Sequence, residues 1–134
     1  GMAFANHSLI EALNRYKNSF NSYPLDRLAQ AGAVASLQDN DYFVACNQKV
    51  IALRHDVTQA LTQLGFTVLP SQANFVFAKP PASMGETIQV FEKLRAQGVI
   101  VRHFNKPKIS SYLRITIGTA EQNQRLLDTL TNLV

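Results

Sequence analysis

Apolar residues in the first half of the chain recur at helical spacing and predict three helices. They are expected over residues 8–16, 25–37 and 40–64. The third is the longest, and its apolar residues follow one another at alternating steps of three and four: Phe43, Cys46, Val50, Leu53, Val57, Ala60 and Leu64. This face is expected to be buried, which makes Cys46 an inert core thiol.

The second half alternates between apolar and polar residues, and this pattern predicts strands. Strands are expected over residues 66–70, 74–79, 99–104 and 112–118, with one helix between the middle two and another after the last. The first two strands are separated by only a short polar turn, so we expect them to pair antiparallel. The order predicts an α+β fold in which N-terminal helices precede a ββαββα unit and helices cover a small, mostly antiparallel sheet. We expect residues 1–134 to form a single domain.

Helix boundaries are indicated by capping pairs and glycines. Three pairs have the spacing of a capping box: Ser8 with Glu11, Ser83 with Glu86, and Thr119 with Gln122. Gly65 and Gly98 are placed to end the helices before them.

An arginine stands in the middle of the last predicted strand, "YLRITIGT", residues 112–119. Leu113 and Ile115 fall on one face of this strand and Arg114 on the other. Arg102 closes the apolar run of the strand before it. If the two strands are neighbours, both guanidinium groups can face one cleft and bind a carboxylate or phosphate. Alternatively, Arg114 extends to solvent or pairs with a nearby acidic residue.

Composition excludes several classes of protein. Apolar residues make up 46% of the chain and charged residues 16%, with a net charge of +4, as expected for a globular domain. With Cys46 as the single cysteine, no apolar run of about 18 residues and no signal-like N-terminus, we expect a cytoplasmic protein without a membrane partner. Glycine-rich phosphate loops, a nucleophile elbow and metal-ligand spacing are absent, so no catalytic or metal-binding residue is assigned.

Three stretches resemble a known enzyme family. They are the N-terminal segment from Ala3, "PSQANFVFAK" at residues 70–79, and "GVIVRHF" followed by "YLRITIGT". Together they resemble the C-terminal part of histidinol-phosphate aminotransferase, a fold-type I enzyme that uses pyridoxal phosphate, over essentially the whole chain. The resemblance implies the small domain of that fold. It also implies that Arg114 binds a substrate carboxylate or phosphate, that Arg102 is a second anion contact, and that Asn21 lies near the active-site entrance.

The family pattern also implies what this sequence lacks. The lysine that holds the cofactor would lie upstream of the matched segment, and the large domain around it is absent. None of the lysines stands in a comparable context: Lys17, Lys49, Lys79, Lys93, Lys106 and Lys108. We therefore expect no cofactor-binding residue, no bound pyridoxal phosphate and negligible transaminase activity in this chain alone. Whether it works as part of an enzyme, with which substrate, and whether another chain supplies the missing domain stay open.

A small domain without its large partner exposes apolar surface, so we expect a homo-oligomer and a small anionic ligand. The alternative function is a standalone anion-binding or oligomerisation module without catalysis. Nucleic-acid binding is disfavoured, because the sequence lacks the aromatic pattern of RNA-binding sheets.

Overall fold

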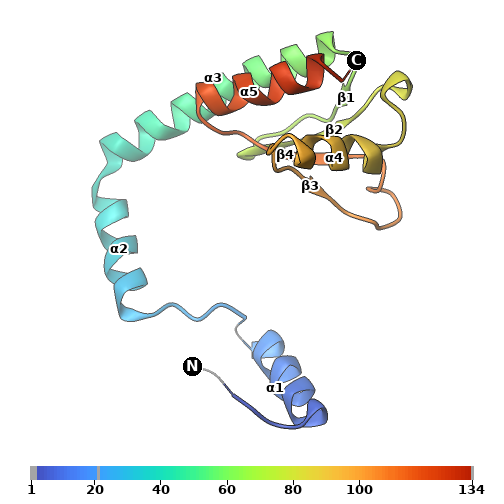
Figure 1. Ribbon diagram of the computed structural model, residues 1–134. Helices are drawn as coiled ribbons and strands as arrows, with labels where there is room; N and C mark the ends of the chain where they lie inside the picture. The colour runs from blue at the N-terminus through green and yellow to red at the C-terminus, as the bar shows by residue number, and fades with distance from the viewer. Residues whose placement is uncertain (1–2, 21, 134) are drawn as a thin grey trace. The chain divides into compact units, whose positions relative to one another are not determined.

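A computed structural model describes residues 3–20 and 22–133 (Figure 1). Its internal contacts divide the chain into two compact units, Gly1–Phe43 and Val44–Val134. The prediction of one domain over residues 1–134 stays a prediction.

The first unit is helical and exposes its apolar side chains. It contains α1 (His7–Phe20), α2 (Arg27–Gln38) and the first residues of α3 (Asn40–Gln63), and none of the residues of α1 or α2 is buried. The capping box predicted from Ser8 and Glu11 is wrong. The side chain of Asn6 caps α1 instead, because its Oδ1 accepts a hydrogen bond from the backbone N–H of Leu9 at 3.0 Å.

The second unit confirms the predicted α+β class and the ββαββα order. After α3 come four strands, β1 (Thr67–Val68), β2 (Phe75–Lys79), β3 (Arg102–His103) and β4 (Leu113–Thr116). A short 3-10 helix, η1 (Ala82–Met84), and α4 (Thr87–Ala96) lie between β2 and β3, and α5 (Ala120–Thr131) follows β4. The sheet order is β1-β2-β4-β3, with every neighbouring pair antiparallel.

One face of this sheet carries the hydrophobic core. Val76 and Ala78 of β2 alternate with half-buried phenylalanines, and Leu113 and Ile115 of β4 alternate with Arg114 and Thr116. The helices α3, α4 and α5 contribute Val57, Leu61, Val90, Leu94, Leu126 and Leu130 to this core, and Phe66, Met84 and Ile117 join it from outside these helices. The other face of the sheet is therefore the one that holds Arg114.

The predicted apolar face on α3 is covered only toward the C-terminal end of the helix. Val57 is 2% exposed, and Val50, Leu53 and Leu64 are partly buried against the core, whereas Phe43 is 55% exposed and Cys46 is half-buried. Leu61, which was absent from the predicted set, is also buried. The prediction that Cys46 lies in the core is wrong. Helical periodicity identified the apolar face correctly, but it does not say how far along the helix that face is covered.

The predicted glycine ends of α3 and α4 and the predicted start of α5 are confirmed, whereas the predicted capping pairs of α1 and α4 do not form. Gly65 and Gly98 both have positive φ, as helix-ending glycines do, and Thr119 with Gln122 forms the predicted capping box of α5. For α4 the box uses Glu86 and Gln89, not Ser83 and Glu86, because Ser83 is part of η1. In the first turn of α5, hydrogen bonds with the Thr119 side chain and then with backbone lower the pKa of Glu121.

Two further features bear on function. Across residues 3–20 and 22–133, no helix combines the length and apolarity needed to cross a bilayer. Within the same residues, no group of three histidine, cysteine or acidic side chains is arranged to hold a metal ion.

Candidate anion-binding site

The two candidate arginines lie directly opposite each other on neighbouring strands. Arg102 of β3 and Arg114 of β4 are Cα partners, and Arg114 is in turn the partner of Phe77 on β2. Directly opposed residues of antiparallel strands project from the same face, so these three side chains form one row across the sheet. The condition set by the sequence, that the two strands be neighbours, is met.

Aromatic rings surround the arginine pair. The Cζ atom of Arg114 is 5.3 Å from the ring centroid of Phe75 and 5.6 Å from that of Phe104. The Cζ atom of Arg102 is 5.3 Å from the same Phe104 ring. At these distances a ring face attracts a guanidinium charge. We call Arg102, Arg114, Phe75, Phe77 and Phe104 the arginine–phenylalanine cluster.

Within residues 3–20 and 22–133, no acidic side chain forms an ion pair with either arginine of this cluster. In the described part of the chain the one salt bridge joins Arg15 to Glu11 in α1, at 2.7 Å, and neither Arg102 nor Arg114 takes part in an ion pair. The Nε of half-buried Arg114 is itself buried and has no hydrogen-bond partner. Like charges placed directly opposite each other destabilise a sheet, and a buried unpaired donor adds to the cost. An anion bound between the arginines would relieve the charge repulsion.

The loop that joins β3 to β4 holds Phe104 and is fixed at its far end. The Nε2 of His103 lies 2.7 Å from the carbonyl oxygen of Ser110, and the hydroxyl of Thr87 donates to the carbonyl of Ser111 at 3.1 Å. The ring of Phe77 stacks on that of Phe104, with centroids 6.5 Å apart and planes 26° from parallel. These contacts fix the side chain that touches both arginines.

The aromatic part of this cluster was not predicted from the sequence. The signal was present, because Phe75 and Phe77 are two residues apart and so share a strand face, and Phe104 stands two residues after Arg102. The sequence does not give the register of the strands, and it is this register that brings Phe75 and Phe77 beside Arg102 and Phe104. Asn21, the third predicted site residue, lies outside the described residues, and its role stays a prediction.

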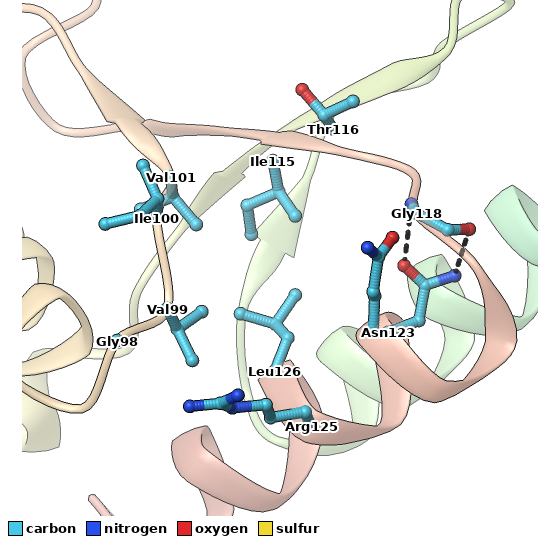
Figure 2. A pocket seen from close by; sticks show the side chains of 11 residues that line it. Gly98, Val99, Ile100, Val101, Ile115, Thr116, Gly118, Asn123, Arg125 and Leu126 are labelled. Carbon is cyan, nitrogen blue, oxygen red and sulfur yellow. Dashed lines mark hydrogen bonds between the residues drawn. The ribbon is translucent and has the colours of Figure 1, made fainter.

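A separate cavity of about 400 Å³ lies among the segment 98–101, β4 and α5 (Figure 2). Its walls combine apolar side chains such as Val99, Ile115 and Leu126 with polar ones, and neither Arg102 nor Arg114 lines it. Two of its polar side chains already make hydrogen bonds within the fold. The amide of Asn123 bonds both the N–H and the carbonyl of Gly118, at 2.9 and 3.2 Å, as the dashed lines of Figure 2 show. Arg125 donates to the carbonyl of Gln97 at 3.2 Å. The arginine–phenylalanine cluster, with donors to spare, is therefore the stronger candidate site.

The lysines do not form a site for pyridoxal phosphate. All six are exposed, so none occupies the desolvated pocket in which burial tunes the amine that forms an imine with a carbonyl cofactor. Lys17 lies 5.6 Å over the ring of Tyr23 in the first unit. The described residues thus do not fit that cofactor by themselves, and no chemical step is assigned through it.

Comparison with known families identifies the class of protein to which this chain belongs. Residues 1–130 match the family model of class I and II aminotransferases, so the chain belongs to that family. Among curated relatives, it is 63% identical over 130 residues to "Histidinol-phosphate aminotransferase 2" of Psychrobacter arcticus. It is 56% identical over 130 residues to the histidinol-phosphate aminotransferase of Acinetobacter baumannii.

The match covers a limited share of those relatives. It includes 97% of this chain but 34% and 36% of the two relatives, so the chain spans about a third of their length. The crystal structure of histidinol-phosphate aminotransferase from Sinorhizobium meliloti in complex with pyridoxal-5'-phosphate superposes with a TM-score of 0.73. That match covers 92% of this chain and 35% of the other, at 19% identity, and shows the shared fold.

Proposed function

We propose that this chain supplies the substrate-anion site of a histidinol-phosphate-type aminotransferase. In that reaction an amino group passes between glutamate or 2-oxoglutarate and histidinol phosphate or imidazole acetol phosphate, in histidine biosynthesis. Arg114 and Arg102 bind the carboxylate or phosphate of the substrate. The proposal is supported by the high identity to relatives of that name and by the chemistry of the arginine pair.

The observation that carries the proposal is the unneutralised pair itself. Arg102 stands directly opposite Arg114, and no described carboxylate pairs with either. Each guanidinium offers a planar set of N–H donors that matches the oxygens of a carboxylate or phosphate. An anion between them accepts from both, and the half-buried position of Arg114 strengthens its interaction because water screens it less. The arginines thereby orient the substrate, which is the contribution of this chain.

Calorimetric or NMR titration of the 134-residue chain tests this role. Inorganic phosphate, glutamate and histidinol phosphate should bind with a Kd of about 1 mM or tighter. Arg114→Ala and Arg102→Ala should each weaken binding about tenfold or more, because each removes charge-assisted hydrogen bonds. Arg95→Ala is the matched control, since it removes an equal charge from an exposed position on α4. If all three variants lost the same binding affinity, the loss would reflect net charge alone, and the anion-binding role of Arg102 and Arg114 would be contradicted.

We further propose that the chain alone has negligible transaminase activity. The exposed lysines give it no amine suited to holding the cofactor. Incubation with pyridoxal phosphate and glutamate should give neither a lysine-linked absorbance band nor 2-oxoglutarate. A lysine-linked absorbance band together with 2-oxoglutarate, in amounts at least equal to that of the chain, would contradict the proposed inactivity. The same result would remove the support for the alternative function, a standalone module without catalysis.

The exposed helices support a homo-oligomer. The apolar residues of α1 and α2 face outward, with Leu9, Leu13, Phe20, Leu28 and Leu37 between 52% and 85% exposed. Apolar surface of this kind drives association in water, and a second copy of the chain offers the same surface. Light scattering should give a mass above that of a monomer, which falls on dilution. A monodisperse monomer at high concentration would contradict the proposal.

We also propose that the chain does not bind nucleic acid. The outer face of the sheet does carry aromatic residues, including Phe75, Phe104 and Tyr112. They are half-buried and contact one another or an arginine, so their faces are occupied and not open to bases. We expect no anisotropy change with single-stranded oligonucleotides at low salt. Salt-sensitive binding would contradict this expectation.

A further inference from the structure

Phe104 is the residue that links the two arginines. It follows Arg102 by two positions, and its ring centroid is 5.3 Å from the Cζ of Arg102 and 5.6 Å from the Cζ of Arg114. Phe75 contacts Arg114, and Phe77 contacts the other rings. Among the described residues, Phe104 is thus the aromatic side chain that contacts both guanidinium groups.

The physics of this contact suits a site that must stay empty until a ligand arrives. Two arginines side by side repel each other, so without a restraint they would move apart into solvent. A carboxylate would hold them together but would also accept their N–H bonds and cancel their charge. An aromatic ring attracts both cations through its quadrupole and accepts no in-plane hydrogen bonds. It therefore restrains the charges and leaves their donors for an anion.

We propose that Phe104 is a positioning residue that holds Arg102 and Arg114 together for anion binding. This inference rests on the proposed function and adds to it the means by which the site is preorganised. Phe104 is itself fixed by the stacked ring of Phe77 on β2. The restraint reduces the ordering cost that two free arginine side chains would otherwise meet on binding.

The test compares Phe104→Leu with Phe104→Tyr in phosphate and glutamate titrations of the 134-residue chain. Leucine keeps an apolar side chain but has no ring, and tyrosine restores the ring. Phe104→Leu should weaken both ligands about fivefold to thirtyfold, and Phe104→Tyr should stay within about twofold of the original chain. Phe91→Leu is the matched control, because Phe91 is a half-buried ring on α4 whose neighbour is His103, 6.0 Å away.

A second measurement needs no variant. NMR of the arginine Nε–H groups in the original chain should show ring-current shifts and restricted motion for Arg102 and Arg114, relative to exposed Arg95. Resonances of both arginines that coincide with that of Arg95 would overturn the proposal. This NMR measurement tests the proposal even if Phe104→Leu fails to fold. In that case the affinity of Phe104→Tyr still tests whether an aromatic ring at this position supports anion binding.

The outcomes separate this inference from the proposed function. If the original chain binds phosphate, Arg114→Ala abolishes binding and Phe104→Leu binds normally, the positioning role is wrong and the anion site stands. If Phe91→Leu loses as much affinity as Phe104→Leu, the effect is general loosening of the fold and the positioning role is again wrong. If the original chain binds no anion, the proposed function fails and this inference fails with it.

Discussion

Among single residues, Asn123 shows how one buried amide can complete a backbone turn. It is 6% exposed, and its side chain pairs with both the N–H and the carbonyl of Gly118, just before α5. Gly118 is packed closely, because a Cβ there would lie 2.5 Å from the Oε1 of Gln122. The pair therefore fixes the chain where β4 passes into α5.

Replacing Asn123 should destabilise the second unit. Asn123→Ala leaves the Gly118 N–H and carbonyl without their side-chain partner at a half-buried position, which costs about 1–3 kcal/mol in the free energy of unfolding. Urea denaturation followed by circular dichroism measures this difference. Gln124→Ala, one residue along on the exposed face of α5, should change stability by less than about 0.5 kcal/mol. Equal effects of the two substitutions would refute a special role for the Asn123 amide.

At the scale of secondary-structure elements, the short strands and the loop between them position the site. The sheet strands are shorter than predicted, with β3 reduced to Arg102–His103 and β4 to Leu113–Thr116. A loop of residues 104–112 connects them, and Lys108 in it has a positive φ of 71°. Phe104 is the first residue of this loop. The hydrogen bonds of Thr87 and His103 to the far end of the loop therefore also help to hold Phe104 in the arginine–phenylalanine cluster.

Removing one anchor should loosen this loop without unfolding the domain. Thr87→Val keeps the side-chain shape and deletes the hydrogen bond to the Ser111 carbonyl. Losing about 1 kcal/mol should raise hydrogen exchange at the amides of Ser110 and Tyr112 by about threefold to tenfold. Thr62→Val is the control, because the Thr62 hydroxyl bonds within α3 at 2.8 Å and is far from the loop in sequence. Exchange unchanged in Thr87→Val would show that the backbone alone holds the loop.

The helices show where local patterns succeed and fail. The box of Thr119 and Gln122 and the glycine ends at Gly65 and Gly98 form as predicted, since each depends on residues within one turn. The start of α4 differs because Pro80-Pro81 leads into η1, which takes Ser83 out of the capping position. The helix α2 is rich in small residues, which permit close packing, yet no neighbouring atom of the described residues lies within 4 Å of the Cβ position at Gly32. Composition permits a close approach but does not provide the partner.

At the scale of the whole molecule, the two units differ in what stabilises them. The core is confined to the second unit, Val44–Val134, where Leu61, Leu94 and Leu130 are fully buried. The helices α1 and α2 of the first unit contribute no buried residue. Cooperative unfolding should therefore report on the second unit.

Matched leucine substitutions distinguish the units. Leu94→Ala leaves a cavity in the core and should lower the free energy of unfolding by about 2–5 kcal/mol. Leu28→Ala on α2, where the side chain is 85% exposed, should change it by less than about 0.5 kcal/mol. Thermal or urea unfolding measured at low protein concentration gives both values. A large loss in Leu28→Ala would indicate that association buries α2, and light scattering would then show it.

The sequence by itself determined the element order, the α+β class and the two faces of β4, because these follow from local periodicity and from residues that cap their own helix. It also singled out Arg102 and Arg114 as unusual charges near apolar strands. Only the tertiary structure decided that Arg102 stands directly opposite Arg114, that one phenylalanine ring serves both, and that Cys46 lies outside the core. Strand register and helix coverage depend on contacts between residues far apart in the chain, and no pattern within a single segment encodes them.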